Sequence, residues 1–404
     1  MRIILIVSFI LSAAFSFYKS RLERSWRDRP LPENVRDVYD EAEYEKWRAY
    51  QKDGDRPSMI KSIVDTVVML IMLLGNVYAK IYYAFDVNVY LRYFLCILIT
   101  SLISCIISIP FEYYDTFVIE EKYGMNKTTK KTFVLDQIKN ELIGLVMSYG
   151  LLLVIMFLYN RFGNTGIVWI AVAIVVISLL ISLLVMPLLK IFNKFKPLED
   201  GELKDKLMEL CTKYGITVRK IVVKDASRRT TTANAFCTGF GKRKTISLDD
   251  NLINDYSTDQ IVAVFAHEFA HARFRHLLKS LPFGLARTVF TVLMLGLAFN
   301  IPSAYTAFGF TEMNYCFAMT VSNLLSWPID VLLDLVSNKI SRDHEYEADA
   351  FAAREGYGEN LVSALKKLCK ESLSDINPHP VIVKMDYSHP TLSQRIEAIV
   401  SCAG

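Results

Sequence analysis

Long apolar stretches separated by charged segments dominate the pattern of this sequence. A bilayer core about 30 Å thick needs roughly 20 apolar residues in helical conformation. Seven stretches approach that length, at residues 2–18, 59–83, 91–113, 141–160, 165–189, 281–299 and 313–336. The pattern therefore predicts a mainly α-helical protein, a bundle of seven transmembrane helices.

The sixth and seventh stretches carry polar side chains. Arg287 interrupts the sixth, and Asn323, Asp330 and Asp334 interrupt the seventh. Polar groups inside a membrane usually face the bundle interior or a water-filled cavity. These residues therefore indicate an aqueous space among the helices, although they would also suit a channel or transporter.

Basic residues are concentrated in every second connecting loop. Ten lie in 19–58 and five in 114–140, whereas the short loops on the other side hold only Arg161. Lys and Arg in short loops favour the cytoplasm, so we expect a lumenal N-terminus and a cytoplasmic C-terminus. A cleaved signal peptide at 2–18 is the alternative, but it would make the ten-base loop lumenal.

The segment between the fifth and sixth stretches is typical of a soluble α/β insert. Residues 203–215 (LKDKLMELCTKYG) have the spacing of an amphipathic helix that ends at Gly215, and 220–227 (KIVVKDAS) resemble a strand. We also expect a short hairpin around 239–241 and a solvated connection at 19–58. The expected division is 1–189 with the first five spans and cytoplasmic loops 19–58 and 114–140, a cytoplasmic α/β segment at 190–280, the last two spans at 281–336, and a cytoplasmic segment at 337–404.

Composition argues against two other classes of protein. Hydrophobic residues make up 52% of the chain and the formal net charge is +4. The Lys and Arg residues cluster between apolar stretches and do not form a continuous stripe that could contact the phosphates of a nucleic-acid backbone. No nucleic-acid partner is therefore expected. The seven cysteines contain no CxxC pair, which favours reduced thiols.

Residues 257–278 carry the main candidate for chemistry. Ser257 and Gln260 have the spacing of a capping box, and no helix breaker follows. His267 and His271 would lie one turn apart on one face, where both imidazoles can bind one Zn²⁺. Glu268 between them would hold the attacking water. The alternative without catalytic function is a helix with two surface histidines and a solvated acid.

A catalytic zinc needs a third protein ligand and one open position. Residues 341–352 (SRDHEYEADAFA) supply candidates, because Glu345 and Asp349 lie at i and i+4 on an expected helix. Glu345 could bind the metal, and Asp349 could accept the second N–H of a ligating histidine. The alternative is a charged helix end in water.

These motifs resemble those of a known family. HEFAH followed about 70 residues later by SRDHEYEADAFA is similar to the type I integral-membrane CAAX prenyl protease, a zinc metalloendopeptidase. Three further stretches carry the resemblance in the same order along the chain. They are PFEYYDTFVIEEKYGMNKTT at 110–129, TANAFCTGFGKRKTISLDDNLI at 232–253 and YSHPTLSQRIEAI at 387–399.

The resemblance implies a hydrated chamber enclosed by seven helices, with zinc on its wall near the cytoplasmic side. It implies location in the endoplasmic reticulum and inner nuclear membrane. The implied reaction removes the last three residues after a prenylated cysteine, and some members also make an N-terminal cut. This chain has HEFAHA where the family usually has HELGHW, which bears on substrate fit more than on zinc binding.

Carried over residue by residue, the resemblance implies zinc ligands His267, His271 and Glu345, the base Glu268, and substrate or oxyanion contacts from Asn234 and His389. The residues themselves support the last two roles only in part. Asn234 lies in a strand-like segment whose free edge could bind an extended peptide, with Phe236 as an apolar contact. It could equally be a turn residue. His389 precedes Pro390, outside a helix interior, and could be a structural histidine.

The leading hypothesis is thus zinc-dependent cleavage of prenylated CAAX proteins or peptides by a protein whose other partner is the lipid bilayer. A broad quality-control protease with the same zinc chemistry is the nearest alternative. A channel or transporter, or a scaffold with a degenerate site, would belong to other classes, and an intact Glu268 argues against the scaffold.

Overall fold

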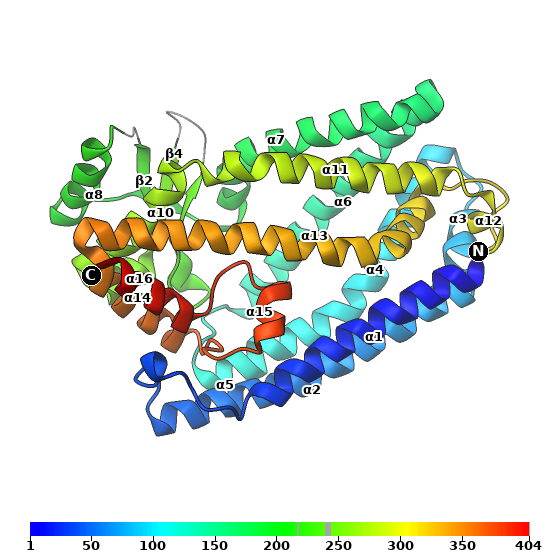
Figure 1. The fold of residues 1–404 in the computed structure, drawn as a ribbon. Helices are drawn as coiled ribbons and strands as arrows, with labels where there is room; N and C mark the ends of the chain where they lie inside the picture. Colours follow the sequence, from blue (N-terminus) through cyan, green and yellow to red (C-terminus); the bar gives the residue numbers. More distant parts are fainter. Residues whose placement is uncertain (216–217, 239–243, 404) are drawn as a thin grey trace.

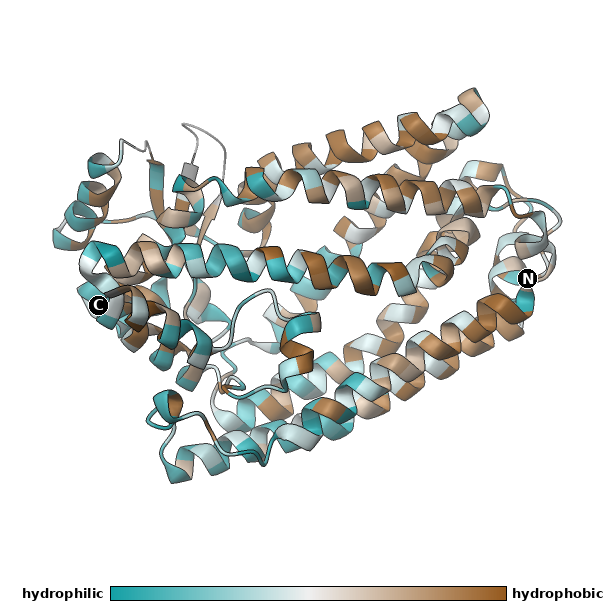
Figure 2. Cartoon of the chain, viewed as in Figure 1, coloured by the Kyte–Doolittle hydropathy of each residue, from teal (hydrophilic) through white to brown (hydrophobic). Residues whose placement is uncertain are grey.

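The computed structural model describes residues 1–215, 218–238 and 244–403, and most of them are helical (Figure 1). Within these ranges, six helical stretches are long and apolar enough to cross a membrane. They are Arg2–Trp26, Glu41–Leu74, Val89–Tyr123, Lys130–Phe192, His276–Phe299 and Tyr315–Glu371. Apolar residues concentrate toward the N-terminal end of the bundle, and polar residues gather around the C-terminus (Figure 2).

The longest stretch contains two helices, α6 (Lys130–Phe162) and α7 (Gly166–Phe192). A short 3-10 segment at Gly163–Thr165 separates them, and α6 and α7 lie against each other. Gly163 has a φ of +57°, which glycine adopts without strain. A Cβ at Gly166 would lie 2.6 Å from the Leu158 carbonyl oxygen. Glycines therefore allow the reversal, and α6 and α7 match the predicted fourth and fifth spans.

The second predicted span, 59–83, is wrong at its C-terminal end. Helix α2 (Glu41–Leu74) already ends at Leu74, and a separate helix, α3 (Val77–Tyr83), follows it. Asn76 between them has a φ of +53°, a left-handed conformation that Asn tolerates better than most residues. The apolar pattern alone contains no signal for this turn.

The expected solvated connection at 19–58 is also wrong in part. Helices α1 (Arg2–Trp26) and α2 occupy most of it, Val35 lies in a 3-10 turn (Glu33–Val35), and Val35 and Trp47 are buried. The Tyr39 hydroxyl donates to the Cys369 carbonyl oxygen at 2.9 Å. The segment thus packs against the C-terminal part of the chain.

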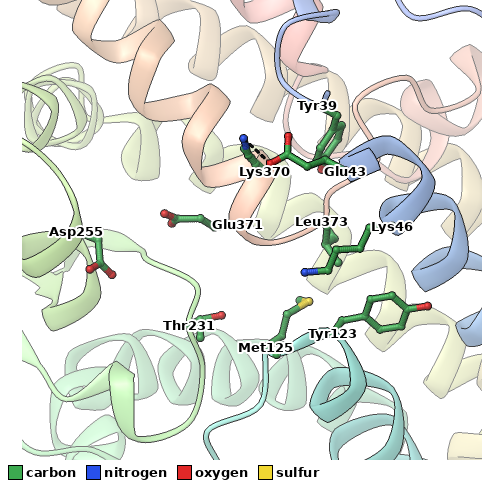
Figure 3. A pocket seen from close by; sticks show the side chains of 11 residues that line it. Tyr39, Glu43, Lys46, Tyr123, Met125, Thr231, Asp255, Lys370, Glu371 and Leu373 are labelled. Carbon is green, nitrogen blue, oxygen red and sulfur yellow. Dashed lines mark ion pairs between the residues drawn. The ribbon is translucent and has the colours of Figure 1, made fainter. Parts of the chain in front are cut away.

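A cavity of about 370 Å³ marks this junction (Figure 3). Glu43 of α2 and Lys370 of α14 (Gly358–Glu371) form an ion pair of 2.6 Å beside it. Met125 and Thr231 line the other side. The N-terminal helices are therefore tied to the segments that carry the candidate chemistry.

The expected α/β segment contains a mixed sheet of four strands within the described ranges, in the order β1-β2-β4-β3. Strand β2 (Val218–Lys224) pairs in parallel with β4 (Lys244–Asp249), and β3 (Ala235–Thr238) pairs antiparallel with β4. The short β1 (Phe195–Pro197) and helix α8 (Glu202–Lys213) precede them. The turn expected around 239–241 lies outside the described residues.

The remaining elements complete two apolar cores. One, around Phe265 and Phe269, joins the sheet to the C-terminal helices, and the other, around Tyr305 and Phe317, lies within the bundle. The elements not yet placed are η2 (Asp115–Glu120, a π-helix), α4 (Val89–Tyr114), α5 (Glu121–Tyr123), η4 (Ala226–Arg228), α9 (Asp250–Asp255), α10 (Thr258–Arg273), α11 (His276–Phe299), α12 (Pro302–Thr306), α13 (Tyr315–Ala352), η6 (Ala353–Tyr357), α15 (Pro380–Asp386) and α16 (Leu392–Ala403).

Candidate metal centre

Helix α10 begins as the sequence predicts. Ser257 accepts from the Gln260 amide at 3.3 Å, and Gln260 accepts from the Ser257 amide at 3.0 Å. This reciprocal capping box satisfies two backbone donors that a helix end leaves open. The helix is buried along most of its length, so the capped and packed helix holds His267 and His271 rigidly.

The other end of α10 differs from the prediction of one uninterrupted helix at 257–278. The helix ends at Arg273, and Arg275 has a φ of +57° before α11 begins at His276. Such a φ is uncommon for a residue other than glycine, which is why the sequence contains no breaker to read. The turn brings the buried His276 back toward α10, with its Nδ1 2.8 Å from Nδ1 of His271.

Three possible ligand atoms converge where α10 packs against α13. The Nε2 atoms of His267 and His271 lie 3.2 Å apart, and each lies 3.3 Å from an oxygen of Glu345. One atom from each side chain falls within 4.8 Å of the others, which is the arrangement of a metal-binding group. Glu345 belongs to α13, because that helix continues well past the predicted span to Ala352.

An ion pair between the buried Asp349 and the mostly buried Arg395 lies next to this group. Asp349 Oδ1 lies 2.9 Å from Nδ1 of His267, and Arg395 of α16 donates to both Asp349 oxygens at 2.6 and 2.8 Å. Arg395 Nη1 also lies 3.9 Å from Glu345. Sequence reasoning missed Arg395, although it lies within the stretch 387–399 that carries the family resemblance.

His276, which had no role among the residues predicted from the sequence, also contacts this group. Its Nε2 lies 2.9 Å from Glu347, and its ring stacks on His344 with a centroid distance of 4.1 Å. Through the Nδ1 contact described above, it holds the far side of His271. In the sequence, the position of His276 five residues after His271 was the signal that could have indicated this contact.

Glu268 faces a small cavity of about 160 Å³ beside this group. Burial raises the pKa of the Glu268 carboxyl, and the nearby imidazoles of His267 and His271 act in the opposite direction. A carboxyl with a raised pKa can exchange a proton nearer neutral pH. His389 and Asn234 also line this cavity.

The two auxiliary residues approach the site from different elements. His389, in the turn before α16, is 63% exposed and places Nε2 3.6 Å from Glu345. Asn234 directly precedes β3, the edge strand of the sheet, and accepts the Ala235 amide with its side chain. Among the residues described, Phe236 does not line the cavity; its ring lies under Lys224 instead.

Family models cover nearly the whole chain. Residues 21–194 match the CAAX prenyl protease N-terminal model, described as five membrane helices, and residues 197–403 match peptidase family M48. The boundary falls between α7 and β1, so the first part supplies membrane helices and the second supplies every residue of the candidate metal centre.

Membrane-crossing helices joined to an HExxH helix and a converging carboxylate define a membrane-embedded metallopeptidase. CAAX prenyl protease 1 of Saccharomyces cerevisiae is 30% identical, over 98% of this chain and 94% of its own. The probable CAAX prenyl protease 1 of Schizosaccharomyces pombe is 31% identical over 96% and 88%. A crystal structure of S. mikatae Ste24p has a TM-score of 0.92 at 28% identity and covers 98% of both chains. The chain belongs to the CAAX prenyl protease 1 family of M48 peptidases.

Proposed function

We propose that this protein is a zinc endopeptidase that removes the last three residues of prenylated CAAX proteins. The observation that carries the proposal is the convergence of His267, His271 and Glu345 beside Glu268. The names of the relatives support the substrate class. A second, N-terminal cut in some substrates is part of the same proposal.

The donor set fits zinc. Two imidazoles and one carboxylate, with a fourth position left for water or substrate, form a common catalytic zinc site. Ligand atoms about 2.0–2.1 Å from a tetrahedral zinc lie about 3.3 Å from one another. The two Nε2 atoms are 3.2 Å apart, and each lies 3.3 Å from a different oxygen of Glu345, which is close to that spacing. Bound zinc would supply Lewis-acid chemistry that polarises a carbonyl and acidifies water.

The proposed mechanism gives each protein group a separate task. Glu268 takes a proton from the attacking water and returns it to the leaving amine, a role that its raised pKa supports. His389 donates a hydrogen bond to the oxygen on which negative charge develops. Asp349 accepts the Nδ1 proton of His267 and so directs Nε2 toward the metal.

Substrate would reach this centre as an extended chain. Strand β3 has no further strand on its outer side within the described ranges, so its edge can accept a peptide by strand addition. Asn234 at the start of β3 would hold the peptide backbone near Glu268. The prenyl group would enter from the bilayer between the apolar helices, into a hydrated chamber enclosed by the bundle.

We propose location in the endoplasmic reticulum membrane, and in the inner nuclear membrane, with a lumenal N-terminus. The alternation of basic loops supports this orientation. It makes the metal centre and the C-terminus cytoplasmic. In the proposed division, 1–189 and 281–336 form the membrane helices, and 190–280 and 337–404 form the catalytic part.

One peptide tests the proposal. A synthetic peptide ending in a CAAX box is incubated, with and without its farnesyl group, with purified protein, and the products are identified by mass spectrometry. We expect a released tripeptide from the farnesylated form only, and none with Glu268→Ala. Equal cleavage of both forms would support a quality-control protease instead, and zinc-independent solute flux would support a transporter.

A further inference from the structure

A second cavity, of about 830 Å³, lies away from the metal centre, where α1, α2 and α4 come together. Its lining residues lie where the apolar sequence of these helices gives way to charged residues, and Figure 2 shows this change as teal following brown along the helices. Its lining comes from all three helices and comprises Arg24, Lys52, Asp53, Asp55, Arg56, Pro57, Met59, Ile60, Pro110, Phe111 and Tyr114.

Two prolines favour an opening at this level. Pro57 lies inside α2 and Pro110 lies inside α4, and both line the cavity. A proline within a helix removes one backbone hydrogen bond and its ring presses on the preceding turn. Helix α4 is then followed directly by the π-helical segment Asp115–Glu120. The helices are therefore irregular where the cavity lies.

The two acids that line the cavity are already neutralised by other groups. Asp53 accepts from Lys122 at 2.6 Å and from the Tyr123 hydroxyl at 2.8 Å. Asp55 is held by Arg24 at 3.3 Å and by Arg27. Neither carboxylate therefore forms an ion pair with the other basic side chains that line the cavity.

Lys52 and Arg56 are those remaining bases. They lie four residues apart on α2, hence on one face of the helix, and both are exposed. In the part of the chain that the structure describes, neither side chain forms a hydrogen bond or an ion pair. Together they place two positive charges beside the cavity, and within the described residues Lys52 acts on Asp53 only through a longer-range electrostatic attraction.

The cavity becomes apolar within a short distance along the helix. Met59 and Ile60 follow on α2 and are 39% and 41% exposed, with Phe111 and Tyr114 of α4 opposite. From Lys52 to Ile60 the helix rises about 12 Å. This sequence of charge and apolar surface matches a lipid whose head group lies at the interface and whose chains enter the hydrocarbon core.

We propose that this cavity binds an anionic phospholipid, with its head group at Lys52 and Arg56 and its acyl chains against Met59, Ile60 and Phe111. The orientation proposed above puts the cavity in the cytoplasmic leaflet, where anionic lipids are concentrated. A head group without net charge would leave both side chains without a direct ion-pair partner among the described residues. The site is separate from the metal centre and does not depend on the peptidase activity.

The test uses the full-length protein in detergent, titrated with phosphatidylserine or phosphatidylcholine and followed by native mass spectrometry. We expect specific retention of phosphatidylserine. The Lys52→Gln/Arg56→Gln variant should bind it about 30-fold more weakly, since each cation near an anionic lipid surface contributes roughly fivefold. Lys46→Gln/Lys127→Gln removes the same charge from exposed positions outside this cavity and should bind like wild type.

Two further arms separate the lipid from a simple anion. Water-soluble glycerophosphoserine and inorganic phosphate lack acyl chains and should not displace the bound lipid at equal concentration. Displacement by either would overturn the proposal, as would equal retention of phosphatidylcholine or an equal loss in the control variant. Thermal unfolding of all variants without added lipid should agree, because the substituted side chains are exposed and form no ion pair or hydrogen bond with the residues that the structure describes.

Discussion

The contact between Asp349 and His267 offers the sharpest single perturbation of the metal centre. Asp349 has no exposed surface and holds His267 on one side and Arg395 on the other. Asp349→Asn keeps the shape of the side chain but removes its charge. The His267 ring then loses an anionic acceptor, while Arg395, whose side chain is 12% exposed, keeps a charge without its partner.

Two magnitudes follow from this geometry. Loss of an outer carboxylate that orients a ligating histidine typically lowers metal affinity or activity about 10–100-fold, which equals roughly 1.4–2.8 kcal/mol. Breaking a buried ion pair by removing one partner costs about 3–5 kcal/mol of folding free energy. Because Asn still offers an oxygen, we expect about 3 kcal/mol.

Zinc affinity is measured by competition with a chromophoric chelator, and stability is measured by denaturant unfolding. Asp343→Asn is the matched control, since it removes the same charge from the same helix at a 56% exposed residue that pairs with Lys339. We expect the control to bind zinc like wild type. If Asp349→Asn bound zinc within twofold of wild type, Asp349 would not orient the ligand and the reasoning would fail.

Three other outcomes are expected. Glu268→Ala should retain about one zinc per chain while peptide hydrolysis falls about 10²–10⁴-fold, as metal analysis and initial rates would reveal. His389→Ala should lower kcat about 10²–10³-fold with zinc still bound; an unchanged kcat would remove it from the mechanism. Glycosylation acceptor sites placed in 19–58, 114–140 and 337–404 should remain unmodified, and modification of any one would contradict the proposed orientation.

The sequence predicted those features that depend on local pattern. Hydrophobic length located the membrane helices, and the capping box located the start of α10. The i and i+4 spacing of Glu345 and Asp349 likewise anticipated that both face His267. Such features need only the helical repeat and the polarity of each side chain.

Features that depend on tertiary packing were not predictable. The turn at Arg275 uses a left-handed conformation in a residue other than glycine, with no proline nearby. The turn at Asn76 has only the local signal of Gly75-Asn76, which the long apolar stretch around it outweighed. Arg395 reaches Asp349 from a helix 46 residues away in sequence, and a single sequence contains no trace of that pairing. The family resemblance pointed to the segment containing Arg395 but not to its contact.

We propose that His267, His271 and Glu345 together hold the catalytic zinc. The most direct measurement is zinc content per chain, determined together with cleavage of a farnesylated CAAX peptide, for purified wild type and Glu345→Ala. We expect about one zinc and tripeptide release for wild type, and loss of both for the variant. A Glu345→Ala protein that bound zinc as tightly as wild type and still cut the peptide would contradict it.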